Sequence, residues 1–200
     1  MKKLLLSIVA LTALAGTAMA DDFNNTGIAL NVENQGVTFG YANGTHADFA
    51  DDAEVFSLGV SNVLPVDFGL QMINDGSADD YRLNVSKGYS KTLINLNVYG
   101  VAEAHYDFGD SYDKNRLVLS PYVGVEMPVG GLTPYAEFGY DFASLEGAHT
   151  DFNRVDSYAA LGTKVSVNDR LDLNLQLLQK MDTDFDSTDR EFVVGFNFKL

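Results

Sequence analysis

The sequence predicts an all-β fold, an antiparallel up-and-down transmembrane β-barrel, and three observations predict it. After Asp21 no segment has a convincing helical period, whereas apolar and polar residues alternate with a period of two in one run after another. Several runs reach about ten residues, the length at which a tilted strand crosses an apolar band of ~25 Å. Short connections also alternate with long, acidic ones along the chain.

The first 20 residues have the pattern of a secretory signal peptide. Lys2 and Lys3 form a positive start, residues 4–15 are apolar, and Ala18-Met19-Ala20 is a small-residue cleavage site. A transmembrane anchor is the alternative, but the apolar run is shorter than the ~20 residues that a spanning helix needs. We therefore expect residues 1–20 to be removed and residues 21–200 to form one barrel domain.

The composition of the expected mature chain excludes some partners. Without Lys2 and Lys3 it holds 11 basic residues against 28 acidic ones, a formal charge of −17, which repels nucleic acid. There is no cysteine, so stability must come from packing and a closed hydrogen-bond ladder rather than from disulfides.

Eleven runs have the alternation of strands, and the last is the clearest. Its apolar face is formed by Phe192, Val194, Phe196, Phe198 and Leu200, and the residues between them form the other face. The eleven runs are 27–33, 37–42, 55–62, 67–74, 81–89, 93–107, 115–126, 133–143, 156–167, 170–180 and 190–200.

The connections predict which rim of the barrel faces outward. Short ones lie at 63–66, 90–92, 128–132 and 168–169, and long ones near 43–53, 75–80, 108–114, 144–155 and 181–189. Acidic residues concentrate in the long set. Outer-membrane barrels have short periplasmic turns and longer extracellular loops, so we expect the long acidic set to be extracellular.

The number of strands does not follow directly from eleven runs, because single-chain bacterial barrels have an even number. Joining 27–33 and 37–42 into one bent strand, with a bulge at Gly36, gives ten strands. Eight or twelve strands stay possible. A soluble β-sandwich or a lipocalin-like barrel also alternates, but the long strands, the unequal connections and the aromatic-rich last strand favour the membrane barrel.

Residues 192–200 resemble the C-terminal assembly signal of outer-membrane barrels, with Phe196, Phe198 and Leu200 at its alternate apolar positions. Leu200 stands where that pattern usually has Phe. The wider resemblance to small porin-like outer-membrane barrels implies a location in the cell outer membrane, contact with its lipid, and assembly by periplasmic chaperones and the barrel-assembly machinery.

A narrower resemblance, to the YfaZ-type small outer-membrane proteins, rests on residues 36–42, 57–60 and 63–65. It implies location more than activity.

The inner face of the predicted barrel carries charges of both signs. Opposite charges in a confined space should pair, because an isolated buried charge is costly. The charged residues expected to line the lumen are Arg82, Glu103, Arg116, Glu126, Glu137 and Lys164. Three tyrosines, Tyr99, Tyr122 and Tyr135, share this face and are expected to fill space.

Catalytic and metal-binding patterns are weak. His105 follows Glu103 on the polar face, but this acid–base pair lacks an obvious nucleophile. His46 and His149 fall in loops, and the histidines have no metal-ligand spacing. Residues 182–186 have acids at alternate positions but lack the glycine and the closing glutamate of a calcium loop. We expect no enzyme activity, no cofactor and no metal.

The sequence therefore favours a porin-like barrel with at most a narrow passive pore for ions or small solutes. The alternative is a plugged barrel with a structural or surface-interaction role through its acidic loops. An outer-membrane enzyme ranks last, and the oligomeric state is left open.

Overall fold

The computed structural model describes residues 25–43, 54–61, 65–74, 79–110, 115–145 and 153–200. Within these ranges the chain forms β-strands and their connections, as the alternation predicts. The expected signal peptide at 1–20 lies outside the described residues, as do most of the long connections. No helix of the described part is long and apolar enough to cross a membrane.

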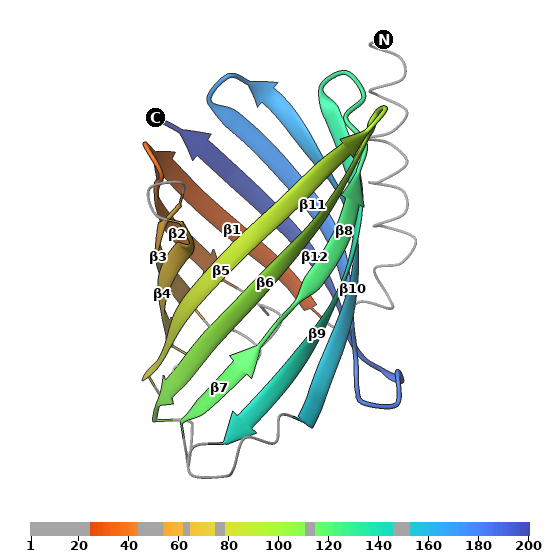
Figure 1. Cartoon of the computed structure of the whole chain (residues 1–200). Coiled ribbons are helices and arrows are strands. Elements are labelled where there is room, and N and C mark those ends of the chain that lie inside the picture. The colour runs from red at the N-terminus through yellow and green to blue at the C-terminus, as the bar shows by residue number, and fades with distance from the viewer. Residues whose placement is uncertain (1–24, 44–53, 62–64, 75–78, 111–114, 146–152) are drawn as a thin grey trace.

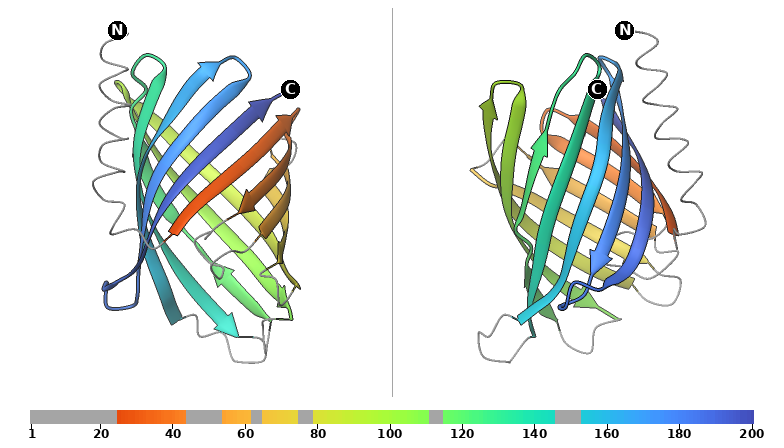
Figure 2. Two further views of the ribbon diagram at one scale, coloured as in Figure 1. Left: turned by 180° about the vertical axis from the view of Figure 1, so that it is seen from behind. Right: turned by 90° about the vertical axis from the view of Figure 1, so that its right-hand side faces the viewer.

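The described residues form twelve strands in one sheet. They are β1 (Asn25–Asn34), β2 (Val37–Asn43), β3 (Glu54–Val60), β4 (Asp67–Asn74), β5 (Asp79–Leu93), β6 (Leu96–Gly109), β7 (Arg116–Leu119), β8 (Tyr122–Glu126), β9 (Leu132–Leu145), β10 (Asn153–Asn168), β11 (Leu171–Met181) and β12 (Ser187–Lys199). Each strand pairs with neighbours on both sides, and β1 pairs with β12, so the sheet closes into a barrel of tilted strands (Figures 1 and 2).

Strands β7 and β8 lie end to end and together occupy one strand position of the barrel wall. Each such position is called a stave below. Both pair with β6 on one side and with β9 on the other. Ser120 and Pro121 interrupt the pattern between them, and Pro121 has no N–H to donate. The ladder nevertheless continues, because the Ser120 N–H donates to the Glu103 carbonyl and the Tyr140 N–H to the Pro121 carbonyl. Among the described residues the wall therefore has eleven staves.

The expected count of ten strands is not confirmed, and joining 27–33 to 37–42 is wrong. Instead, β1 and β2 form an antiparallel hairpin in which Asn34 pairs with Val37. Gln35 and Gly36 between them have φ values of 50° and 83°. Two successive residues with positive φ reverse the chain in a tight hairpin turn, whereas a bulge would only bend it.

An odd number of staves forces one parallel contact, because neighbours cannot alternate in direction all the way around an odd ring. That contact is the pair β1–β12, which runs from Asn25 opposite Glu191 to Glu33 opposite Lys199. All other paired strands of the described sheet are antiparallel.

The described short connections and the one long connection that the structure describes throughout lie at opposite rims, as predicted. The turns at 35–36, 94–95, 127–131 and 169–170 and the chain end at Leu200 gather at one rim, and the 182–186 connection lies at the other (Figure 1). The turn expected at 90–92 lies at 94–95, because β5 continues to Leu93.

The outer surface is mostly apolar and the inner surface is mostly polar. On β6, for example, Leu96 and Val98 point outward and are exposed, while Glu103 and His105 point into the lumen. The exposed large apolar side chains come from nearly every strand and include Phe39, Phe56, Leu58, Phe68, Leu70, Leu83, Leu117, Val123, Leu161 and Phe198. A water-soluble barrel has the opposite arrangement, with its apolar side chains inside.

Aromatic residues gather on the outer surface toward the rim of the long connections. Tyr41 contacts Phe56 with ring centroids 5.1 Å apart, and Phe108 contacts both Tyr81 and Tyr106, at 5.5 and 5.9 Å. Such a girdle is typical of the level at which a membrane barrel meets the lipid headgroups.

Candidate lumenal site

The inner wall encloses a cavity of about 260 Å³. Strands around most of the wall contribute to it, from Gln71 on β4 to Glu191 and Val193 on β12. Among the described residues that line the cavity, four carry carboxylates and one a guanidinium: Glu103, Glu137, Asp141 and Glu191, and Arg82. The cavity is therefore rich in acidic groups.

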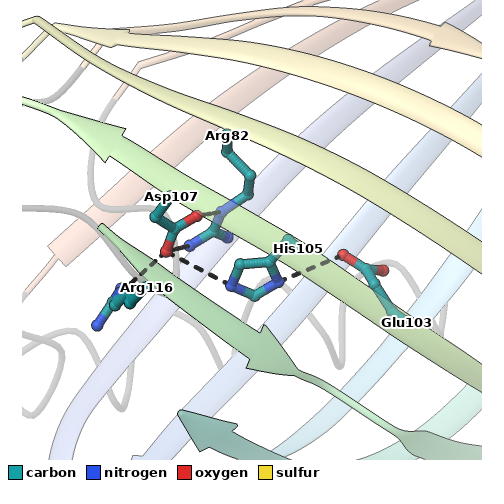
Figure 3. A network of polar contacts seen from close by, with 5 residues as sticks. All are labelled: Arg82, Glu103, His105, Asp107 and Arg116. Carbon is teal, nitrogen blue, oxygen red and sulfur yellow. Dashed lines mark hydrogen bonds and ion pairs between the residues drawn. The ribbon is translucent and has the colours of Figure 1, made fainter. Parts of the chain in front are cut away.

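A buried cluster around Asp107 forms one part of the lumenal wall (Figure 3). Asp107 lies directly opposite Arg82 on β5 and Arg116 on β7. Arg82 donates through Nε to Oδ1 at 2.7 Å and through a terminal nitrogen to Oδ2 at 3.1 Å. Arg116 donates through Nε to Oδ2 at 2.9 Å. One carboxylate, only 1% exposed, thus neutralises part of the charge of two arginines.

His105 lies between Asp107 and Glu103 on the same face of β6 (Figure 3). Its Nε2 is 3.6 Å from Oδ2 of Asp107 and its Nδ1 is 3.9 Å from Oε1 of Glu103, distances too long for hydrogen bonds. The Oγ of Ser120 also lines the cavity, and it has no hydrogen-bond partner among the described residues. Among the described residues, Ser120 is therefore not hydrogen-bonded to His105. A serine nucleophile would need such a hydrogen bond to the base that activates it.

Glu137 on β9 is held by two tyrosines. Its Oε2 accepts a hydrogen bond from the hydroxyl of Tyr99, and its Oε1 accepts one from Tyr158, both at 3.0 Å. Tyr99 reaches Glu137 across the intervening strand β8, where Gly124 lies opposite both residues. These hydrogen bonds fix the position of the carboxylate at the edge of the cavity.

Three of these lumenal tyrosines lie flat on the wall, because each covers a glycine of the neighbouring strand. A Cβ on Gly124 would overlap the ring of Tyr99, one on Gly139 that of Tyr158, and one on Gly162 that of Tyr135. Tyr99 and Tyr135 were expected to fill the lumen, but the glycines let their rings lie against the sheet. The lumen is correspondingly wider.

Two further ion pairs lie toward the rim of the short connections. Lys164 Nζ is 3.1 Å from Glu126, which also accepts a hydrogen bond from Asn97 at 3.2 Å. Lys199 Nζ is 2.5 Å from Asp172. These groups are more exposed than the Asp107 cluster.

The six charged residues expected in the lumen therefore fall into three groups. Arg82, Glu103 and Glu137 line the cavity, and Arg116 joins Arg82 on Asp107. Glu126 and Lys164 pair with each other nearer the short connections. Sequence reasoning missed Asp107, Asp141, Tyr158, Lys180 and Glu191. The alternation could have found Asp107 and Glu191, because they share a face with Glu103 and Val193.

A second cavity of about 240 Å³ lies against β2, β3, β4 and β5. Several of its inward-facing positions have a small side chain or none, as at Ser57, Gly59, Gly69 and Ser86. Gln71 lines both cavities, so both spaces border this residue.

The side chain of Asp182 organises the 182–186 connection. The N–H groups of Asp184 and Asp186 donate to Oδ1 of Asp182 at 2.9 and 3.0 Å, and Phe185 contacts Tyr140. No cluster of three or more His, Cys, Asp or Glu side chains that could hold a metal ion occurs within the described residues. His46 and His149 lie outside them.

No family model matches the sequence, and no curated protein does. Two solved structures are similar to the barrel. One is OmpTdeltaL8, a loop L8 deletion mutant of OmpT, an outer membrane protein of Vibrio cholerae, with 11% identity, a TM-score of 0.42, and coverage of 79% of this chain and 58% of that one. The other is an anion-selective porin from Comamonas acidovorans, with 16% identity, a TM-score of 0.31, and coverage of 82% and 52%.

The chain thus spans little more than half the length of either similar protein. Because the sequence identities and TM-scores are low, the activity of neither protein is assigned to this chain. No comparison confirms the YfaZ-type resemblance.

Proposed function

We propose that the chain is an integral outer-membrane β-barrel with a narrow passive pore that favours small cations. The observation that carries the proposal is the acidic cavity of about 260 Å³ inside a barrel with an apolar outer surface, with a second cavity that also borders Gln71. An apolar exterior and a polar interior suit a barrel surrounded by lipid.

The proposed environment is the lipid of the cell outer membrane. In a closed barrel every backbone N–H and C=O of the wall is paired, which is what lipid requires of a membrane-spanning sheet. Phe196, Phe198 and Leu200 are the proposed assembly signal for the barrel-assembly machinery and the periplasmic chaperones.

The proposed pore is narrow for two reasons. A barrel of about eight strands is just filled by side chains, whereas sixteen strands leave an aqueous channel, and eleven staves lie nearer the filled end. Arg82 and the Asp107 cluster also occupy part of the lumen. The excess of carboxylates along the cavity favours cations over anions.

Planar-bilayer recording of the refolded protein tests this proposal. We expect a small conductance, well below that of a sixteen-strand porin. In a KCl gradient the dilute side should become positive, since cations cross more readily. Protein that migrates as folded on a gel but conducts nothing would instead support the plugged barrel with a surface role, and a large anion-selective current would contradict the proposal outright.

The tyrosines that lie flat on the wall give a second expectation. In Gly124→Ala the new Cβ overlaps the ring of Tyr99, which must leave the wall and enter the lumen. Single-channel conductance should therefore fall. Gly59→Ala is the matched control, because its Cβ also faces the lumen but meets no atom nearer than 3.7 Å. Equal conductance in the two variants would show that Tyr99 does not set the width of the pore.

A further inference from the structure

Most of the charged groups that line the acidic cavity are carboxylates, which accept hydrogen bonds and donate none. The two cations beside it already hold carboxylates, Arg82 on Asp107 and Lys180 on Glu191 at 2.7 Å. Glu137, by contrast, is held by the uncharged hydroxyls of Tyr99 and Tyr158. Each carboxylate oxygen has two lone pairs, so Glu137 can accept further hydrogen bonds from the cavity side.

Two neutral oxygens add to this set of acceptors. The Oε1 of Gln71 and the Oγ of Ser120 are buried atoms in the cavity lining, and neither has a hydrogen-bond partner among the described residues. A buried polar atom without a partner costs free energy that a suitable donor would recover. The cavity therefore matches a ligand that donates several hydrogen bonds and carries positive charge.

The size and the apolar part of the lining restrict this ligand further. A volume of about 260 Å³ lies below the ~300–1,000 Å³ of pockets for drug-sized ligands. Leu178 and Val193 give one side of the cavity an aliphatic surface. The ring of Tyr158 covers Gly139, which leaves its other face available to a cation.

We propose that this cavity is a binding site for small aliphatic diamines. One ammonium group lies near Glu137 and Asp141, the second near Glu103 and Ser120, and the methylene chain contacts Leu178 and Val193. An ammonium group has three donors and no acceptor, which matches the set of acceptors described above. The inference deepens the proposed cation-favouring pore by naming a solute, and rests on it for access to the lumen.

Isothermal titration of the full refolded chain in detergent micelles tests the site, with 1,4-diaminobutane as the probe and 1,4-butanediol as its uncharged isostere. The diamine is expected to bind once per barrel, and the diol is expected not to bind. Equal binding of the two compounds would overturn the proposal, and this comparison needs no variant protein.

The variants Glu137→Gln and Glu126→Gln then place the site. Both remove one lumenal negative charge, but Glu126 pairs with Lys164 and does not line the cavity. Glu137→Gln should weaken the affinity about tenfold, the value of one charged hydrogen bond, and Glu126→Gln less than about twofold. If Glu137→Gln does not refold, Asp141→Asn serves instead. Equal weakening by both lumenal variants would mean general attraction to negative charge and would overturn the site.

The binding experiment and the conductance experiment can have different outcomes, so they distinguish the diamine site from the pore. If the protein binds the diamine but passes no current, the proposed site is supported and the proposed pore is contradicted. If the protein forms a cation-selective pore but does not bind the diamine, the proposed function is supported and the diamine site is overturned.

Discussion

Replacing Asp107 with alanine is expected to lower the free energy of unfolding by at least about 3 kcal/mol. The carboxylate receives three hydrogen bonds from Arg82 and Arg116, and the side chain of Arg82 is only 7% exposed. Without Asp107, two guanidinium groups face each other in a confined lumen with no carboxylate between them. Denaturant unfolding in lipid vesicles, followed by circular dichroism, measures the loss.

Asp172→Ala is the matched control for that experiment. It also removes a carboxylate from a lumenal ion pair, but Lys199 is 52% exposed and can be hydrated once Asp172 is gone. An exposed pair of this kind contributes only about 0–1 kcal/mol. Similar losses in the two variants would show that the Asp107 cluster is as well hydrated as the rim.

The second large effect concerns the outer surface. Val194 lies near the middle of β12 on the outward face, so in the proposed outer-membrane barrel an arginine there would sit near the midplane of the lipid. Val194→Arg should cost on the order of 2–4 kcal/mol, since charged residues on the lipid face are most destabilising at that depth.

Phe198→Arg controls for depth, because Phe198 lies on the same face one residue before the end of the strand. The cost should fall to about 0–1 kcal/mol near the interface. The same unfolding experiment compares the two variants. A larger loss at Phe198 than at Val194 would contradict the proposed position of the barrel in lipid.

The alternation of the sequence was enough to predict the strands and their facing. Each run from 55–62 onward corresponds to one stave of the wall, and the run 115–126 became β7 and β8 of one stave. Alternation works here because the outer surface and the lumen differ in polarity, so the two faces of each strand differ as well.

The pairing of the first strand could not be predicted in the same way. Alternation tells which face a residue occupies but not which strand lies beside it. The parallel pair β1–β12 therefore leaves no trace in the pattern, and the rule of even strand number pointed to the wrong repair at Gly36.

The sequence predicted which side chains face the lumen, but not which of them contact one another. The alternation placed Arg82 and Arg116 on the inner face, yet their shared partner Asp107 lies near the end of β6, beside a long connection. The register that brings these three residues into one row depends on the exact strand ends, which a single sequence does not fix.

Every lumenal distance depends on how the barrel closes, and disulfide formation across the seam tests that closure most directly. The chain has no cysteine, so two can be introduced without background. Ala29 on β1 lies opposite Gly195 on β12, whereas Ala42 lies one strand further away, on β2.

Oxidation is expected to link cysteines at 29 and 195, detected as a mobility shift on a denaturing, non-reducing gel. The pair 42 and 195 should stay reduced, because two strand spacings are about 9.6 Å and a disulfide needs Cα atoms within about 7 Å. A link between 42 and 195, with none between 29 and 195, would mean that β12 closes directly on β2 in a ten-stave antiparallel barrel, and would contradict the eleven-stave wall.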